Sequence, residues 1–586
     1  MDKDRVAAAL GEIGTLLELQ GESSFRCQAY HNGARAIESL EGDLATIVAE
    51  GKLGEIRGIG ETLKEKITTL VKTGALPFLD DLRAKTPAGL LQMIRIPGLG
   101  PKKVKTLYDQ LKIDTLEKLK AACEAGTIAG LKGFGAKTQE KILAGIDFVA
   151  ESGQRVRLDQ ALPIALALKE GVAAAPGVIR IELCGSIRRR KETIKDIDLL
   201  VSSDDAGPIM DRFVALPGVV KVTGRGDTKA SVVVNAGSAA KPLHINADLR
   251  VVNDQQFPYA LNYFTGSKEH CIAMRVRAQQ HQLKLNEYAL AGAQRSVQCK
   301  TEADIFKALG LSYVPPELRE DTGEMDAAST NSLPQLVELG DIRGVFHCHT
   351  TESDGAATLE EMAAATKALG LKYLGIGDHS RSLTVANGLT PDRVRKQQAA
   401  IDALNDRLKG FHVFKGTECD ILPDGRLDFD DDLLATFDYV VASVHSHFNQ
   451  TREEMTARII RAIRHPAVTM LGHATGRLLL RREAYPVDLE AVLQAAAECG
   501  TLVEINAHPQ RLDIDWIHCK RAKTLGVQVV INPDAHSTSD LAYFSYGVDV
   551  ARRGWLTKED VFNTKSTAEV MKALAARKQA KGIAGK

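Results

Sequence analysis

The sequence lacks several features that would assign it to a common class at once. No apolar run approaches the roughly 20 residues of a membrane helix, and the first residues, MDKDRVAAALGEIG, lack the apolar stretch of a signal peptide. The nine cysteines include no C-x-x-C pair, which argues against a disulfide framework or a four-cysteine zinc site. Nothing signals an oligomer. We therefore expect a cytoplasmic monomer without a membrane partner.

A surplus of one charge is also missing, because 75 Lys and Arg residues balance 75 Asp and Glu residues. The local distribution is more informative. Residues 51–143 hold 17 basic against 10 acidic residues, whereas residues 337–586 hold 31 against 33 and eleven of the fifteen histidines. With 586 residues the chain is too long for one core. We expect several domains, with a basic N-terminal region and a histidine-rich C-terminal region that do different work.

The basic region repeats one turn three times: IRGIGETLKEKI at 56–67, IPGLGPKKVKTL at 96–107 and LKGFGAKTQEKI at 131–142. Each copy places Gly-apolar-Gly before a lysine-bearing helix start. Glycine lets a phosphate approach the backbone, and the helix N-terminus offers free N–H groups. One copy could equally be a tight helix corner, but three copies favour the helix-hairpin-helix pattern, which holds a nucleic-acid backbone without reading bases. The candidate DNA contacts are Gly58, Gly60, Lys66, Gly98, Gly100, Lys102, Gly133 and Gly135.

Short β-branched runs after residue 151 contain a second pattern, CGSIRRRKETIKDIDLLV. The period of a strand puts Asp196 and Asp198 on one face, and Asp248 lies on another predicted strand that could run alongside. Three carboxylates with two Mg²⁺ ions are the minimum for in-line nucleotidyl transfer. A D-x-D pair alone is usually an acidic strand edge. Here Gly185-Ser186 and Arg189 precede it, and their amides and guanidinium suit a triphosphate.

The histidine-rich region alternates strands and helices from residue 336 onward, which predicts a parallel barrel with functional residues at strand ends. It begins with FHCHTTESDG. A single strand-end histidine is usually a surface residue, but a shared position on successive strands favours a metal site. The candidate ligands are His347, His349, Asp354, His379, Glu418, His445, His473, Asp534 and His536.

This region resembles the polymerase and histidinol phosphatase (PHP) superfamily over about residues 337–575. The resemblance implies that all nine candidates bind up to three zinc or manganese ions in a distorted barrel. It also implies phosphoester hydrolysis by a metal-activated water. One departure is Val345-Phe346, where family members often carry Asp-Leu.

With NYFTGSKEH at 262–270, the first ~320 residues resemble the family X DNA polymerases, and the order of parts matches bacterial members that carry a PHP domain. The resemblance implies that the three aspartates hold catalytic Mg²⁺ or Mn²⁺. Lys66 also falls where some relatives carry the Schiff-base lysine of a lyase, although a phosphate contact is the simpler interpretation. The implied nucleotide-binding residues are Gly185, Ser186, Arg189, Tyr263, Phe264, Gly266 and, toward the template, Arg275.

Three residues depart from the polymerase pattern. Arg190 and Lys195 stand at positions where family X polymerases commonly have glycine. These basic side chains could either attract phosphate or crowd its approach to the backbone. Cys271 replaces an asparagine that hydrogen-bonds near the base pair in relatives, and losing one such bond costs ~1 kcal/mol.

The predicted architecture is multidomain, with a helical N-terminal region, an α/β nucleotidyltransferase palm and a distorted (β/α) PHP barrel. The predicted boundaries are 1–85 for a helical DNA-binding domain, 86–150 for helix-hairpin-helix fingers, 151–258 for the palm, 259–318 for a nucleotide-selection (thumb-like) subdomain, 319–336 for a linker, 337–578 for the PHP domain and 579–586 for a basic tail.

The predicted function is DNA repair: gap filling from dNTPs on gapped or primed DNA, together with metal-dependent 3′→5′ exonuclease or 3′-end processing, with abasic-site cleavage left open. One alternative is a polymerase core weakened into a DNA-binding module that delivers ends to the PHP nuclease. Another is a PHP domain that hydrolyses a small phosphate ester.

Overall fold

The computed structural model describes residues 3–38, 44–56, 59–94, 96, 99–131, 133–135, 138–140, 142–143, 146, 155–235, 243–293, 296–480, 482 and 484–583. The chain divides into two compact units, one of Met1–Gln154 with Ser238–His244 and one of Arg155–Gly237 with Ile245–Lys586. Among the described residues, no helix combines the length and the apolar character that crossing a membrane requires.

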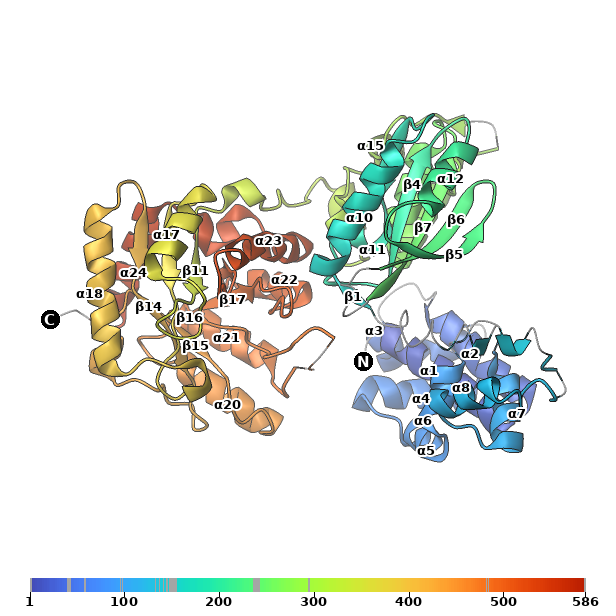
Figure 1. The fold of residues 1–586 in the computed structure, drawn as a ribbon, viewed down its shortest axis with the longest axis horizontal. Helices are drawn as coiled ribbons and strands as arrows, with labels where there is room; N and C mark the ends of the chain where they lie inside the picture. Colours follow the sequence, from blue (N-terminus) through green and yellow to red (C-terminus); the bar gives the residue numbers. More distant parts are fainter. Residues whose placement is uncertain are drawn as a thin grey trace. The chain divides into compact units, whose positions relative to one another are not determined.

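The first unit is helical (Figure 1). Its helices pack around two apolar cores, one formed mainly by the first five helices and one by the next three. Glycines stand immediately before two of the helices that bury apolar residues: Gly60 before α4 and Gly100 before α7. The helices are α1 (Lys3–Gln20), α2 (Ser24–Glu38), α3 (Leu44–Ala49), η1 (Lys52–Glu55), α4 (Glu61–Thr73), α5 (Pro77–Lys85), α6 (Ala88–Met93), α7 (Pro101–Leu111) and α8 (Leu116–Glu124).

The palm is a five-stranded sheet in the order β2-β4-β7-β6-β5, with α10 and α12 against it (Figure 1). Strand β4 runs antiparallel to β2 and parallel to β7. Its apolar stretch from Leu199 to Val201 is buried, which explains why an apolar run follows the two aspartates. The elements are β1 (Val156–Arg157), α10 (Leu158–Ala173), β2 (Arg180–Leu183), α11 (Gly185–Arg188), β3 (Thr193–Ile194), β4 (Asp196–Ser202), α12 (Gly207–Val214), β5 (Val219–Arg225), β6 (Lys229–Asn235) and β7 (His244–Val252).

The next segment has its own core, built around Tyr259, Met274 and Phe306. The core extends past the expected domain end at residue 318. Residues 319–336, expected as a linker, contain a helix. Two residues of this segment, Arg319 and Glu324, are fully buried. The elements are α13 (Phe257–Thr265), α14 (Lys268–Gln280), β8 (Lys284–Leu285), β9 (Leu290–Ala291), β10 (Ser296–Val297), α15 (Glu302–Ala308), η2 (Pro316–Leu318) and α16 (Glu324–Ser329).

The C-terminal region is a barrel of parallel strands. Two sheets, β11-β12-β13 and β14-β15-β16-β17-β18, are joined by parallel bridges between Cys348 and Ala535 and between His379 and Glu418. Every strand is buried along nearly its whole length, as expected for a parallel sheet enclosed by helices. The strands are β11 (Gly344–Cys348), β12 (Tyr373–Ile376), β13 (His412–Phe414), β14 (Gly416–Asp420), β15 (Tyr439–Ser443), β16 (Met470–Leu471), β17 (Leu502–Asn506) and β18 (Val529–Asn532).

Helices surround these strands (Figure 1) and bury an apolar face against them. Several begin with a capping box, such as Thr358 with Glu361 and Thr451 with Glu454, which satisfies the free N–H groups of the first turn. They are η3 (Leu339–Asp341), α17 (Leu359–Ala368), η4 (Thr384–Ala386), α18 (Pro391–Arg407), α19 (Asp431–Leu434), α20 (Arg452–Ile463), α21 (Leu489–Cys499), α22 (Trp516–Thr524), η5 (Asp540–Tyr543), α23 (Phe544–Arg553), η6 (Lys558–Asp560), η7 (Phe562–Thr564) and α24 (Thr567–Ala580).

Candidate active sites

The three palm aspartates meet at one end of the parallel strand pair β4–β7. Asp198 is the direct register partner of Asp248, and Asp196 lies two residues before Asp198, on the same face of β4. Burial, followed by the charges of Asp196 and Asp248, raises the pKa of Asp198 to about 7. Three carboxylates held this close repel one another, and divalent cations would relieve that repulsion.

Gly185 lies directly against this cluster. It has a left-handed φ of 60°, and an added Cβ would lie 2.2 Å from Oδ2 of Asp198. No side chain fits here without displacing the carboxylate. The next residue, Ser186, has a buried hydroxyl with no hydrogen-bond partner, so its Oγ is available to a ligand.

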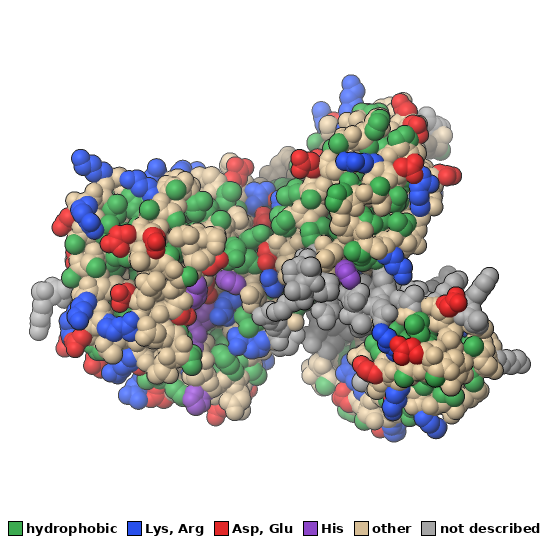
Figure 2. All heavy atoms as spheres, in the orientation of Figure 1, with side chains coloured by type: hydrophobic (Ala, Val, Ile, Leu, Met, Phe, Trp, Pro, Cys, Tyr) green, Lys and Arg blue, Asp and Glu red, His purple; other side chains and the backbone are tan. Residues whose placement is uncertain are grey.

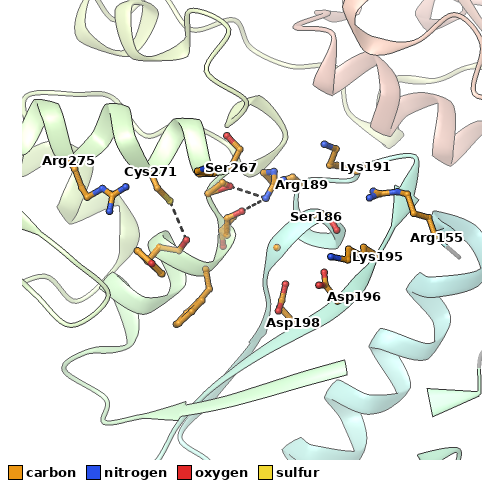
Figure 3. Close-up of a pocket in the computed structure, with 16 residues that line it drawn as sticks. Arg155, Ser186, Arg189, Lys191, Lys195, Asp196, Asp198, Ser267, Cys271 and Arg275 are labelled. Atoms are coloured by element: carbon orange, nitrogen blue, oxygen red, sulfur yellow. Dashed lines mark hydrogen bonds between the residues drawn. The ribbon is translucent and has the colours of Figure 1, made fainter. Parts of the chain in front are cut away.

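A cavity of about 460 Å³ opens beside the aspartates. Figure 3 shows Asp196 and Asp198 facing Ser186, with Lys195 next to them. The other lining residues are Arg155, Gly185, Arg189, Lys191, Tyr263, Phe264, Thr265, Gly266, Ser267, Lys268, Cys271 and Arg275. Basic side chains around paired carboxylates suit a polyanion that arrives with a cation.

Arg189 is largely committed to protein acceptors. Its Nη1 donates to the carbonyl oxygens of Thr265 at 2.6 Å and Gly266 at 3.0 Å, and its Nε donates to Glu320 at 3.1 Å. Two of these bonds are drawn in Figure 3. Arg189 therefore fastens the turn after α13 to the palm.

The three departures from the polymerase pattern have different surroundings. Arg190 does not line the cavity; it adopts a left-handed φ of 57° and its Nε lies 3.7 Å from Oδ1 of Asp549. Lys195 does line the cavity. The thiol of Cys271 donates to the carbonyl of Tyr263 at 3.3 Å, and burial raises its pKa to about 11. Cys271 is therefore a neutral thiol that braces the same turn.

The helical unit contains the expected turns in part. Gly58 and Gly98 lie outside the described residues. Gly60, Gly100 and Gly135 each accept the first backbone hydrogen bonds of the following helical turn. At these three positions an added Cβ would meet no other atom within 4 Å. Gly133 has a φ of 89°, which favours glycine. These turns leave helix N-termini open to an anion.

Two lysines in this unit were predicted to contact DNA. Lys102 is exposed in the first turn of α7. Lys66 packs differently, with Nζ 3.9 Å from the centre of the Phe78 ring. Burial, with a smaller effect of the Arg26 charge, lowers the pKa of Lys66.

All nine candidate metal ligands converge at the carboxyl ends of the barrel strands. His347 and Glu418 lie within β11 and β14, and the other seven follow β11, β12, β15, β16 and β18. Figure 2 shows histidine side chains reaching the surface of this region in a group. Three sets could each surround one ion: His349, Asp354, His379 and His536; His347, His349 and Asp534; and His379, Glu418 and His445. His473 joins them, because its Nε2 lies 2.9 Å from Oε1 of Glu418.

The donors in this cluster fit divalent metal ions. Both ring nitrogens of His349 are buried and make no hydrogen bond, and the same holds for Nε2 of His347. Burial, helped by the charges of His536 and His379, lowers the pKa of His349 to about 3, and a neutral imidazole is the form that binds a metal ion. His347 and Asp534 have left-handed φ values of 56° and 51°. Such strain is typical of functional sites.

Two of the candidate histidines, His347 and His445, are oriented by buried carboxylates that were not predicted from the sequence. Nδ1 of His347 lies 2.6 Å from Glu504, which is fully buried in β17. Glu504 also accepts from the amides of Asn506 and Asn532. Nδ1 of His445 lies 2.5 Å from Asp420. The only sequence signal for Glu504 is a charged residue inside the apolar strand LVEIN.

Four family models match the chain. They are a helix-hairpin-helix domain at residues 1–76, a SAM-like helix-hairpin-helix tandem at 90–147, a DNA polymerase beta thumb at 260–320 and a PHP domain at 346–508. The polymerase thumb model covers the segment that contains the Arg189-bound turn, and the PHP model covers seven of the nine candidate ligands.

Curated relatives match the whole chain or one half of it. DNA polymerase/3′-5′ exonuclease PolX of Bacillus subtilis is 37% identical over 97% of this chain and 99% of its own length. Rat DNA polymerase lambda is 27% identical over 49% of this chain and 52% of its own length. A probable phosphatase of Thermoanaerobacter is 29% identical over 37% of this chain and 89% of its own length. The chain belongs to the family X DNA polymerases that combine helix-hairpin-helix domains and a polymerase beta-like core with a C-terminal PHP domain.

Proposed function

We propose that this protein is a DNA repair enzyme with two active sites: a template-directed polymerase that fills gaps from dNTPs, and a PHP nuclease that removes nucleotides from 3′ ends. The observation that carries the proposal is the presence of two separate ligand sets in one chain, the aspartates on β4 and β7 and the nine residues at the barrel end.

In the polymerase site, Asp196, Asp198 and Asp248 hold two Mg²⁺ or Mn²⁺ ions, which supply charge neutralisation for the primer oxygen and the triphosphate. The free hydroxyl of Ser186 contacts the triphosphate. Tyr263, Phe264 and Arg275 line the cavity. In this proposal the two aromatic residues border the sugar and base, and Arg275 lies toward the template strand. Arg189 serves the nucleotide by holding the 265–266 turn.

In the PHP site, the nine ligands hold up to three zinc or manganese ions, which supply an activated water for phosphoester hydrolysis. Glu504 and Asp420 fix the ring orientations of two of these ligands, His347 and His445. The helix-hairpin-helix turns bind the DNA backbone through glycine amides and Lys102, without base preference. Gapped or primed DNA is therefore the substrate class.

The test uses a 5′-labelled primer on DNA with a one-nucleotide gap, with Mn²⁺, with and without dNTPs. We expect Asp198→Ala to lose extension and keep shortening, and His379→Ala to do the reverse. The matched controls are Asp204→Ala, an exposed aspartate of the palm, and His465→Ala, away from the ligand cluster. Extension that survives in Asp198→Ala refutes the polymerase assignment.

The same assay separates the rival function, in which the core only binds DNA and delivers ends. That function predicts shortening without extension in the intact chain. Rapid hydrolysis of a small phosphate ester with no action on DNA would instead support a stand-alone phosphatase.

A further inference from the structure

The loop of residues 189–192, which begins at the last residue of the polymerase motif G-S-I-R-R, contacts the PHP barrel at three of its four residues. The carbonyl oxygen of Arg189 accepts a hydrogen bond from Nη1 of Arg553 at 2.7 Å. Arg190 faces Asp549, and Glu192 accepts from Nη2 of Arg477 at 3.0 Å. All of these residues belong to one compact unit. The palm loop is thus held by the barrel from several sides.

Arg553 is the most enclosed of these contacts. It is the last residue of α23 and only 1% exposed, with its guanidinium carbon 5.0 Å from the centre of the Trp516 ring. Its Nη1 also lies 3.1 Å from Oε1 of Glu320. The same carboxylate oxygen accepts from Nε of Arg189, so one carboxylate joins two buried guanidinium groups.

The charges in this group depend on one another. Burial alone would raise the pKa of Glu320, but Arg189, Arg553 and Lys191 outweigh it and the pKa is lowered. If the Arg553 charge is removed, Glu320 keeps only part of this compensation, and the Arg189 carbonyl loses its charged donor. Both changes act on the residue that fastens the turn of Thr265 and Gly266.

We propose that Arg553 of the PHP domain is a positioning residue for the polymerase, because its bonds to Glu320 and to the Arg189 carbonyl set the 265–266 turn for the incoming nucleotide. The proposal rests on the proposed function of the palm cavity. The barrel then has a second role besides nuclease activity, because it supports one side of the nucleotide pocket.

Arg190 fits the same scheme. A left-handed φ favours glycine, which family X polymerases commonly have at this position. Here the arginine side chain extends to Asp549 on α23 and does not enter the cavity. The loss of glycine therefore supplies a further link to the barrel.

The experiment is single-turnover gap filling by the full chain, which separates the dNTP dissociation constant from the maximal rate of incorporation. Arg553→Met removes the charge and keeps the length of the side chain. We expect ~10-fold weaker dNTP binding, the effect of one lost buried charged hydrogen bond, with the maximal rate changed by less than about threefold. Arg553→Lys should restore part of the affinity, and 3′→5′ exonuclease rate and metal content should match the intact chain.

The matched control is Arg552→Met. Arg552 is adjacent on the same helix and also bridges to the thumb-like segment, through Glu317 at 2.8 Å, but it does not contact Glu320 or the 189–192 loop. Its dNTP affinity should be unchanged. Equal losses in both variants would overturn the proposal, because the general contact between the regions would then explain them.

Unchanged dNTP affinity in folded Arg553→Met would also overturn it. Should Arg553→Met not fold, Glu320→Gln tests the same path from the other side and should weaken dNTP binding by a similar factor. If the intact chain shows no dNTP-dependent extension, the proposed polymerase function itself fails, which is a different result.

Discussion

Gly185 shows how one missing side chain protects a catalytic geometry. A methyl group at this position would meet the Asp198 carboxylate. We expect Gly185→Ala to lower the maximal incorporation rate by about 100-fold, because a shift of about 1 Å in a catalytic group can cost that much. Single-turnover gap filling measures the rate, and a thermal melt checks the fold.

Gly177→Ala is the matched control. Gly177 has a left-handed φ of 82° in the same palm, but its added Cβ would approach only Oγ of Ser203, at 3.3 Å. It imposes similar backbone strain away from the aspartates. Equal rate losses in the two variants would show that strain, and not the displaced carboxylate, is responsible.

Glu504 gives a second prediction at the residue scale. Glu504→Gln keeps the shape of the side chain and removes the charge that orients His347. We expect 10- to 100-fold weaker metal retention or exonuclease activity, a typical effect of losing such a partner. Metal analysis after dialysis checks it, with gap filling unchanged. Glu490→Gln, on the surface of α21 and paired with Arg521, should behave like the intact chain.

Residue identity pointed to the candidate ligands but not to the residues that orient them. The nine barrel residues follow a motif, and the structure brings them together. Glu504 and Arg553 belong to no motif. Glu504 acts on His347, 157 residues earlier in the sequence, and Arg553 acts on Glu320, 233 residues earlier. Their roles depend on tertiary contacts that no local pattern encodes.

At the scale of elements, α15 begins with a buried carboxylate held between two arginines. Arg188 Nη2 lies 2.6 Å and Arg319 Nη1 2.7 Å from the two oxygens of Glu302. Burial alone would raise the pKa of Glu302, but Arg319 and Arg188 outweigh it and lower the pKa to about 2. A carboxylate whose pKa is lower in the folded than in the unfolded state stabilises the fold at pH values above the unfolded-state pKa. This stabilisation is lost as the pH falls through the folded-state pKa.

We therefore expect Glu302→Gln to destabilise the thumb-like segment by about 3 kcal/mol at pH 7, and by less than half of that near pH 3. Hydrogen exchange over residues 260–320 at the two pH values measures the local free energy of opening. Glu269→Gln, in the first turn of α14, is the control. A pH-independent difference would contradict the electrostatic explanation.

The arrangement of the secondary-structure elements could be predicted only in part from the sequence. The strands around Asp196 and Asp248 were predicted separately, and period-2 geometry placed Asp196 and Asp198 on one face. Their parallel register, with Asp198 opposite Asp248, was not predictable, because it depends on how the intervening β5 and β6 are ordered in the sheet. The segment 319–336 looked like a linker because it is polar, yet Arg319 and Glu324 are polar residues buried through ion pairs.

At the scale of the whole molecule, the helical unit is the part that we propose binds the DNA backbone. Lys102 lies in the first turn of α7, two residues after Gly100, in the second copy of the repeated turn. Lys102→Ala should weaken binding to gapped DNA regardless of base sequence and reduce the salt slope of log K by about 0.9. Fluorescence anisotropy across a salt series measures this. Lys72→Ala, at the far end of α4, should leave the slope unchanged, and a change in base preference would contradict a backbone contact.

The order of the domains along the chain was predicted from sequence, whereas the union of palm, thumb-like segment and barrel in one compact unit was not. That union depends on pairs such as Arg552 with Glu317 and Arg477 with Glu192. Each such pair looks like ordinary surface charge until the fold brings its members together.

The candidate metal ligands of the barrel come from the ends of both its first and its last strand, so a metal site that includes His347 also needs Asp534. During synthesis the three palm aspartates are all present once residue 248 has left the ribosome, whereas the last nuclease ligand emerges nearly three hundred residues later. A chain that ends between these points lacks part of the candidate nuclease metal site. We therefore expect fragments that end between these points to lack the nuclease activity.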